Sequence, residues 1–266
     1  MAAPVNTVLP AITGTVTVGS ALALSNGTWT DDGSPAFVYA WLRDGVVIAS
    51  QVANAYTIAL ADIAALLTGR VTNTDTGGTT AATSAATIAV PSTLVVETGA
   101  VVASADSYLS ITDADTYHAA RANTAWAALA ASAKEAALRK ATDYMLQMYR
   151  ARWKGVRYSA TQTLDWPRAY VYTDPALTGA IGEFPYLVTS NIVPTEVKNA
   201  CAELALKAAT ADLAPDLERA KLSTTVGPIA VTYDRATPQY TRYRAIDATL
   251  APYLGGSSVN IQLLRT

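Results

Sequence analysis

The sequence predicts a two-part protein, an all-β sandwich followed by a mainly α-helical module with one β-hairpin or long loop. Residues 5–90 show no helical period, and short runs of Thr, Val, Ala and Gly are separated by turn signals, which is typical of sandwich strands. After Pro91, apolar residues recur at spacings of three and four, which indicates amphipathic helices. The expected parts are a β domain at 1–92, a linker at 93–103, a helical domain at 104–254 and an extended tail at 255–266.

Seven strands are expected in the front part. The Asp44-Gly45 step between two of them favours a tight hairpin, because both residues tolerate the positive φ that such a turn needs. Core packing is the main interpretation for Trp29, Trp41 and Tyr56, and an aromatic sugar-binding surface is the alternative. The expected strands cover residues 7–12, 21–29, 36–43, 46–50, 55–59, 67–73 and 85–90.

A resemblance covers nearly all of this front part. The stretches NTVLPAITGTVTVGSALALSNGTWT, YAWLRDGVVIAS and YTIALADIAALLTGRVTN are similar to the immunoglobulin-like (Ig-like) repeats of bacterial and phage surface proteins, and Trp41 stands where such a domain places its core tryptophan. The resemblance implies an Ig-like sandwich with no shared chemistry. A host-surface adhesion or decoration protein with weak glycan contacts is therefore one alternative function.

Four helices are expected behind Pro91. Thr112 with Asp115, and Ser132 with Glu135, have the spacing of capping boxes, so helices are expected from residue 113 to about 121 and from residue 132 onward. A third helix starts at Pro194, and its apolar stripe includes Cys201 as a small core residue. A fourth starts near Tyr243, and the run KLSTTVGPIAVTYD reads as a hairpin or projecting loop around Gly227-Pro228.

The order of these pieces resembles the head-to-tail adaptor (connector) family of tailed phages, many members of which are also labelled DnaT-like single-stranded-DNA-binding proteins. The more specific marks are Trp153-Lys154-Gly155, Leu164-x-Trp166-Pro167-Arg168 and Ile192-Val193-Pro194. The resemblance implies a ring, commonly of twelve subunits, that binds the portal protein and a downstream tail or nozzle protein. Genomic DNA would pass through the ring without sequence-specific contact. It also implies synthesis in the host cytoplasm, location at the head-tail junction of the virion and no membrane contact.

The resemblance also suggests that the C-terminal tail docks into the portal protein. Apolar residues alternate along this tail, which suits an extended strand that becomes ordered on a partner. An ordinary frayed terminus is the alternative. The candidate portal-binding residues are Val259, Ile261, Leu263, Leu264 and Arg265.

A second candidate site is the basic run at the end of the long helix. Its side chains could contact an acidic portal surface or DNA phosphates, and a solvated helix end is an equally weighted alternative. Aromatic residues interleave with them, as in proteins that stack single-stranded bases, although aromatics at helical spacing are more often core. The basic residues are Arg150, Arg152, Lys154 and Arg157, and the aromatic residues are Tyr149, Trp153 and Trp166.

Composition argues against an enzyme. The chain has one histidine, His118, and one cysteine, Cys201. These are too few for a Cys/His metal cluster or for a nucleophile activated by a histidine base. No catalytic residue, no metal and no cofactor are therefore expected. The formal charge of −2 lacks the basic excess of a strong nucleic-acid binder, and the first 92 residues have only Arg43 and Arg70 as basic side chains. No run of apolar residues reaches membrane-spanning length and no secretion signal is visible, so a soluble protein is expected.

Overall fold

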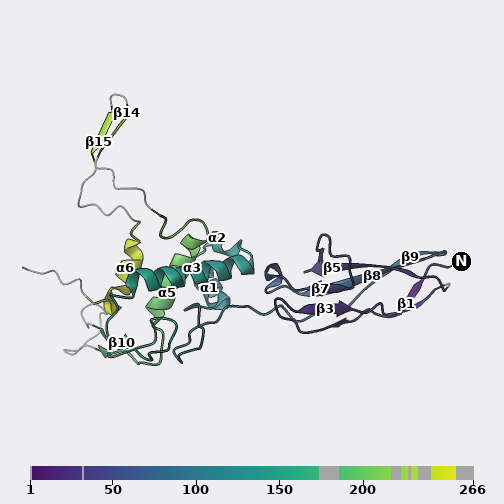
Figure 1. The fold of residues 1–266 in the computed structure, drawn as a ribbon, viewed down its shortest axis with the longest axis horizontal. Coiled ribbons are helices and arrows are strands. Elements are labelled where there is room, and N and C mark those ends of the chain that lie inside the picture. The colour runs from purple at the N-terminus through teal and green to yellow at the C-terminus, as the bar shows by residue number, and fades with distance from the viewer. Residues whose placement is uncertain are drawn as a thin grey trace, which may run out of the picture. The chain divides into compact units, whose positions relative to one another are not determined.

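The computed structural model describes residues 2–31, 33–173, 186–216, 223–226, 229–232 and 241–255, with the backbone alone at 223–226 and 229–232. The chain divides into two compact units (Figure 1). Unit 1 comprises Met1–Thr93 with Ala130–Ser132, and unit 2 comprises Leu94–Leu129 with Ala133–Thr266.

Unit 1 is built from β-strands that pair into three antiparallel sheets. One sheet has four strands in the order β6-β5-β8-β9, another has three in the order β2-β3-β7, and a third pairs β1 with β4. The strands are β1 (Val5–Val8), β2 (Ile12–Thr13), β3 (Ala21–Leu24), β4 (Thr28–Thr30), β5 (Ala36–Arg43), β6 (Val46–Val47), β7 (Ala55–Thr57), β8 (Leu67–Asp75) and β9 (Gly78–Thr83), with a 3-10 turn η1 at Leu60–Asp62.

The longest pairing in unit 1 joins β5 to β8, from Ala36 opposite Thr74 to Arg43 opposite Leu67. The predicted hairpin after β5 is confirmed, because Asp44 and Gly45 both have positive φ, 47° and 82°. This tight turn matches the twist of the two flanking strands.

The core of unit 1 forms around Trp41, which is fully buried. The Trp41 ring stacks on Tyr56 with 5.4 Å between ring centroids, and its Nε1 donates a hydrogen bond to the Ala53 carbonyl at 3.0 Å. The main interpretation of these two residues as core is therefore confirmed. The other members of this core are Leu22, Leu24, Ile58, Leu67, Val71 and Val90.

The buried carboxylate of Asp62 connects two strands of unit 1 through side-chain hydrogen bonds. Tyr56 Oη donates to it at 2.6 Å, and Arg43 forms an ion pair with it, also at 2.6 Å. The Ala59 backbone N–H donates a third bond at 2.7 Å. Burial, reinforced by the bond to Asp62, raises the pKa of Tyr56 to about 12. A buried charge is stable only with such partners.

Unit 2 combines helices with very short strands. Its helices are α1 (Ile111–Ala119), α2 (Thr124–Ala127), α3 (Ala131–Tyr149), α5 (Thr195–Ala208) and α6 (Arg244–Leu250), with a 3-10 turn η2 at Ala251–Tyr253. The described part of unit 2 also has three two-stranded antiparallel sheets, and two of them pair strands of only two residues, which are too short to give a periodic signal in the sequence. These sheets pair β10 (Val156–Arg157) with β11 (Arg168–Ala169), β12 (Tyr172–Thr173) with β13 (Tyr186–Leu187), and β14 (Ser223–Val226) with β15 (Ile229–Thr232).

The predicted fold class, an all-β Ig-like sandwich followed by a mainly α-helical module, is wrong. The chain is a mixed α and β protein with several small antiparallel sheets. Local alternation of side chains correctly indicated strands but carries no information on how they divide among sheets, because pairing is decided by residues far apart in sequence. The segment expected as one strand at 21–29 breaks into β3 and β4, and 85–90 contributes only a bridge from Val90 to Ile63.

Two predicted helix starts are also corrected. Ser110, not Thr112, caps α1, because its side chain accepts a hydrogen bond from the Asp113 backbone N–H. Ser132 lies inside α3, which begins at Ala131, and the buried Glu135 pairs with Arg139 at 3.3 Å. The predicted hairpin is confirmed in the backbone, where Val226 lies opposite Ile229.

The core of unit 2 forms where α3 meets α5. Leu138, Ala141 and Met145 from α3 are buried with Val197, Cys201 and Leu204 from α5. Burial raises the pKa of the Cys201 thiol to about 11, so this residue is a core side chain as expected. The same core continues into residues 164–171, which brings the small strands of unit 2 against the helices.

His118, the single histidine of the chain, is a buried part of this unit. Its ring lies 4.7 Å from that of Trp126, and one ring nitrogen lies 3.1 Å from the Ala202 carbonyl. The other ring nitrogen lies 2.9 Å from the Asn123 amide nitrogen. A neutral imidazole satisfies both contacts, one as donor and one as acceptor. Burial lowers the pKa of His118.

Candidate nucleic-acid interface

The aromatic residues of the predicted basic-aromatic run lie in the core. Tyr149, Trp153 and Trp166 are all buried. Ring centroids are 5.8 Å apart between Tyr149 and Trp153, and 5.7 Å apart both between Trp153 and Trp166 and between Trp166 and Tyr253. These rings join the end of α3 to η2, so they cannot stack on the bases of a bound strand.

Two of the four predicted basic residues have carboxylate partners within the chain. Arg150 Nε donates to the buried carboxylate of Asp165 at 3.0 Å. Arg152 lies 3.6 Å from Asp247 and over the Tyr149 ring. Much of their charge is therefore neutralised within the fold, which weakens any long-range attraction for phosphate.

Lys154 is bound by backbone carbonyls instead. Its Nζ donates to Pro252 at 2.8 Å and to Tyr172 at 3.1 Å, so it connects η2 to β12. Arg157 differs from the other three, since its Nε is buried without a hydrogen-bond acceptor and no ion pair forms within the described residues.

A second arginine lies directly across the sheet from Arg157. In the β10–β11 pair, Arg157 is opposite Arg168. The buried Arg168 guanidinium donates to the carbonyls of Lys154 and Gly155 at 2.8 Å and of Asp165 at 3.2 Å. Burial lowers the pKa of Arg168, and nearby Arg157 lowers it further. Like charges at opposite positions of two paired strands repel each other and destabilise the pair. The two arginines therefore form a positive site, where a bound anion would offset the repulsion.

Exposed tyrosines follow the strands that carry these two arginines and occur in the next strand pair. Tyr158 follows β10 and Tyr170 separates β11 from β12, with 54% and 70% of their surfaces exposed. Tyr172 in β12 is 47% exposed and Tyr186 in β13 is 46% exposed. We call these four residues, with Arg157, the tyrosine surface.

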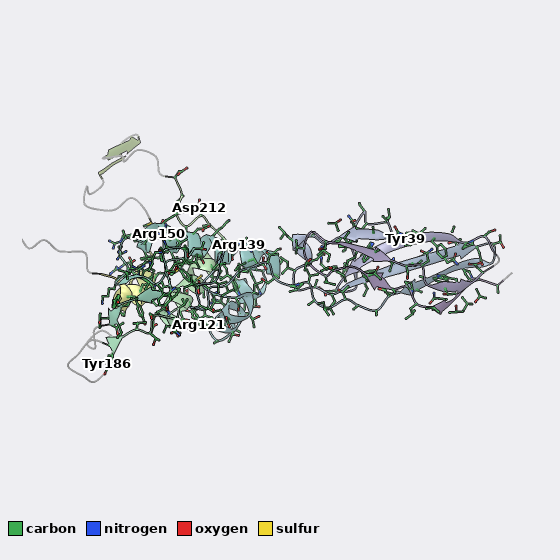
Figure 2. The ribbon with its side chains drawn as sticks, turned by 60° about the horizontal axis from the view of Figure 1, so that its bottom comes forward. Tyr39, Arg121, Arg139, Arg150, Tyr186 and Asp212 are labelled. Atoms are coloured by element: carbon green, nitrogen blue, oxygen red, sulfur yellow. The ribbon has the colours of Figure 1, made fainter. Side chains whose placement is uncertain are left out.

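Backbone hydrogen bonds extend both of the strand pairs that carry these residues. Tyr158 N–H donates to the Pro167 carbonyl at 3.2 Å, which extends the β10–β11 pairing by one residue. Val188 N–H donates to the Val171 carbonyl at 2.8 Å, which extends the β12–β13 pairing. Figure 1 shows β10 and α6 at the same end of unit 2, and Figure 2 marks Arg150 and Tyr186 within this unit.

Chemically, the tyrosine surface combines the two elements of a single-strand binding surface. Tyrosine rings provide flat apolar faces for bases, and an arginine without a carboxylate partner provides a phosphate contact. Val156 in β10 and Leu187 in β13 are exposed as well, so the exposed side chains of these strands are more apolar than charged. The tyrosine surface is therefore suited to weak contacts with phosphate and substantial contacts with flat or apolar groups.

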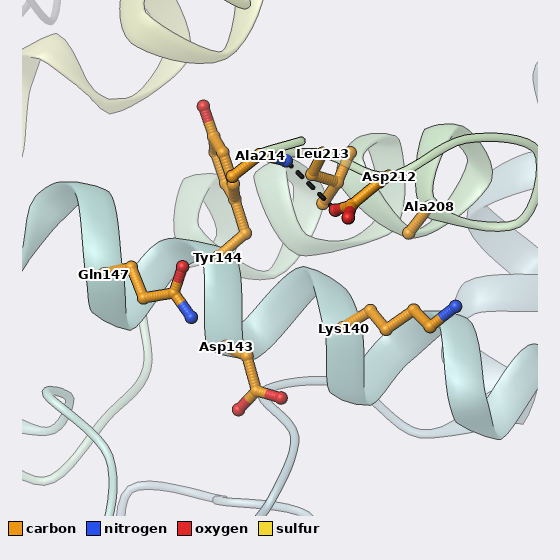
Figure 3. Close-up of a pocket in the computed structure, with 8 residues that line it drawn as sticks. All are labelled: Lys140, Asp143, Tyr144, Gln147, Ala208, Asp212, Leu213 and Ala214. Atoms are coloured by element: carbon orange, nitrogen blue, oxygen red, sulfur yellow. Dashed lines mark hydrogen bonds between the residues drawn. The ribbon is translucent and has the colours of Figure 1, made fainter. Parts of the chain in front are cut away.

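The hollow beside α3 is a poorer candidate (Figure 3). It has a volume of about 390 Å³ and lies between α3 and the segment after α5. Asp212 accepts a hydrogen bond from the Ala214 backbone at 3.2 Å, and Asp143 adds a second carboxylate, whose pKa is raised by burial and by Asp106. Lys140 is the one basic side chain in the lining, so two carboxylates would oppose a bound phosphate.

The predicted portal-binding residues Val259, Ile261, Leu263, Leu264 and Arg265 lie outside the described residues. Within the described part of the chain, no group of three or more metal-binding side chains forms. No described helix is long and apolar enough to cross a membrane.

A sequence-family model described as "Putative DnaT-like ssDNA binding protein" matches residues 92–266, about two thirds of the chain. The chain belongs to this DnaT-like family. The match covers α1 to α6 and every residue of the tyrosine surface. No curated protein and no solved structure matches the chain.

Sequence reasoning named Arg157 but missed the tyrosines of this DnaT-like protein. One signal was present, because the stretch from 170 to 191 is rich in aromatics, glycine and proline and does not fit the helical pattern on either side. Buried Trp166 and exposed Tyr170 cannot be distinguished by residue type, since both lie in short irregular segments. The packing of Trp166 against Trp153 and Tyr253 separates the two environments.

Proposed function

We propose that this chain is a non-catalytic protein that binds single-stranded DNA through the tyrosine surface of unit 2, without sequence preference. Family membership supports the ligand class. The observation that carries the proposal is Arg157, a partly exposed cation without a carboxylate partner in the described chain, in a strand pair that is followed on its two strands by the exposed residues Tyr158 and Tyr170. Phosphate contact and base stacking are both independent of sequence.

The affinity is expected to be modest. Arg150 and Arg152 are occupied by Asp165 and Asp247, and the formal charge of the whole chain is −2. Few counterions are therefore released on binding, so affinity should fall with salt along a shallow slope. Most of the binding free energy would come from stacking.

Fluorescence anisotropy of a labelled oligo-thymidine on the full chain tests this proposal. We expect saturable binding at about 50 mM salt that weakens by about 200 mM. Arg157→Gln should weaken binding several-fold and reduce the salt slope by about 1. Arg121→Gln is the matched control, because Arg121 is an exposed arginine that stacks on Tyr117 and is not part of the tyrosine surface; this variant should bind like the wild type. Absence of binding at low salt, or equal effects of both variants, would contradict the proposal.

A second candidate is the head-to-tail adaptor of a tailed phage, which forms a ring on the portal protein. The observation that favours it is the apolar content of the exposed side chains in these strands, where Tyr172 lies opposite Leu187 and Val156 is exposed as well. Tyrosine-rich apolar patches are typical of protein interfaces, and a closed ring needs a heterologous interface with two different faces. Mass measurement of the purified chain, alone and with portal protein, separates a ring from a monomer.

A further inference from the structure

Tyr170 has an unusual backbone conformation for its side chain. Its φ is 58°, in the left-handed region, where the Cβ of an L-residue crowds the backbone and glycine is favoured. When a tyrosine adopts a positive φ, packing contacts of its side chain normally offset the conformational strain of the backbone. At Tyr170 they do not, because 70% of its surface is exposed.

The flanking residues hold Tyr170 in place. Arg168, two residues before it, is fixed by the carbonyls of Lys154 and Gly155. Val171, immediately after it, is fully buried and accepts a hydrogen bond from Val188. The chain therefore has anchors on both sides of Tyr170, and the exposed ring projects from a fixed backbone.

The segment before β10 packs closely against β11 here. A Cβ added at Gly155 would collide with the carbonyl oxygen of Ala169, so the two backbones are too close for any side chain at position 155. Gly155 also has a positive φ of 65°. Close backbone contacts therefore hold the residue next to Tyr170 independently of the tyrosine ring.

We infer that Tyr170 is the residue of the tyrosine surface on which an unpaired base stacks, and that it makes the surface select single-stranded over duplex DNA. This inference rests on the proposed function. Because the backbone is held on both sides of Tyr170, stacking on its exposed ring orders only the side chain. Bases in a duplex already stack on one another, so only an unpaired base can present its face to Tyr170. Strained residues of this kind cluster at ligand-binding sites.

The test substitutes Tyr170 in the full chain and measures thermal midpoint and oligonucleotide affinity. Tyr170→Gly and Tyr170→Asn should fold with an equal or higher midpoint, because both residues tolerate a positive φ. Their affinity for oligo-thymidine should fall roughly tenfold, the effect of losing one stacked base. Tyr170→Phe should keep the wild-type affinity. The wild type should bind the single strand more tightly than the matched duplex, and Tyr170→Gly should lose that preference.

Ser50→Gly is the matched control for strain. Ser50 is exposed in unit 1 with a φ of 63°, so this variant relieves a similar conformation without touching the tyrosine surface. It should raise the midpoint and leave binding unchanged.

The outcomes separate the inference from the proposed function. If the wild type binds and Tyr170→Gly binds equally well, the role of Tyr170 is refuted while single-strand binding stands. A lower thermal midpoint for both Tyr170→Gly and Tyr170→Asn would show that the ring stabilises the fold, which also overturns the inference. If the wild type binds neither strand form, the proposed function and the inference fail together.

Discussion

Arg157 lies directly opposite Arg168 in the two-residue sheet formed by β10 and β11. The two guanidinium groups have different surroundings. Arg168 is buried and donates to three backbone carbonyls, whereas the Nε of Arg157 is buried without an acceptor. One arginine therefore stabilises the fold, and the other is left available for an anion.

This difference predicts opposite effects of substitution. Arg168→Met should lower the free energy of unfolding by about 3 kcal/mol, because it leaves buried carbonyls of residues 154, 155 and 165 without a donor. Arg157→Gln should leave stability unchanged or slightly higher, since it removes a like charge across the sheet. Denaturant unfolding of both variants measures this. Equal destabilisation by the two substitutions would show that Arg157 has a structural role.

Asp62 should be a main stabilising residue of unit 1. Asp62→Ala removes the acceptor for Tyr56, Arg43 and the Ala59 backbone, so we expect a loss of about 2 to 3 kcal/mol. Tyr56→Phe removes only one of these bonds and should cost about 1 kcal/mol. Urea unfolding followed by tryptophan fluorescence measures both, and an undiminished midpoint for Asp62→Ala would refute this assignment.

His118 predicts a pH dependence of the stability of unit 2. Burial lowers its pKa below the ordinary 6.5, so the unfolded chain takes up the proton more readily than the folded chain. Stability is therefore complete above about pH 6.5 and is lost as the pH falls below that value. Asp143, whose pKa is raised, acts in the opposite direction and at more acidic pH.

The check is the thermal midpoint of the chain between about pH 7.5 and 5.5. Because His118 is the single histidine, a decline over this range is assigned to it and should be absent in His118→Gln. A flat profile in the wild type would contradict the buried neutral imidazole.

The C-terminal tail predicts a separation of folding from assembly. A chain that ends at Gly255 keeps the bridge between Trp153 and Leu254 and the hydrogen bond from Gly255 N–H to the Arg152 carbonyl, so its thermal midpoint should match that of the full chain. If the tail docks into portal protein, this truncation should abolish co-purification with portal. Unchanged co-purification would refute tail docking.

The sequence predicted elements better than it predicted their arrangement. The stripe of Leu138, Ala141 and Met145 in α3 and the turn at Asp44-Gly45 depend on neighbours in sequence, and both are present as expected. The division of the front strands into three sheets depends on distant pairings such as β3 with β7. Local periodicity does not specify such pairings.

The candidate site shows the same limit. Arg157 could be singled out as basic, but Arg150 and Arg152 gave an identical signal, and only the positions of Asp165 and Asp247 separate them. Trp153 and Trp166 were candidates for base stacking because they are aromatic. Their burial follows from contacts with Tyr149 and Tyr253, at the ends of α3 and η2.

Photo-crosslinking tests the central claim most directly. A single-stranded oligonucleotide carrying bromodeoxyuridine would be irradiated with the full chain, and the attached peptides mapped by mass spectrometry. We predict crosslinks at Tyr158, Tyr170, Tyr172 or Tyr186, and their loss in the presence of excess unlabelled single strand. Crosslinks confined to residues 1–93 or to the hollow beside α3, or no specific crosslink at low salt, would contradict single-strand binding by the tyrosine surface.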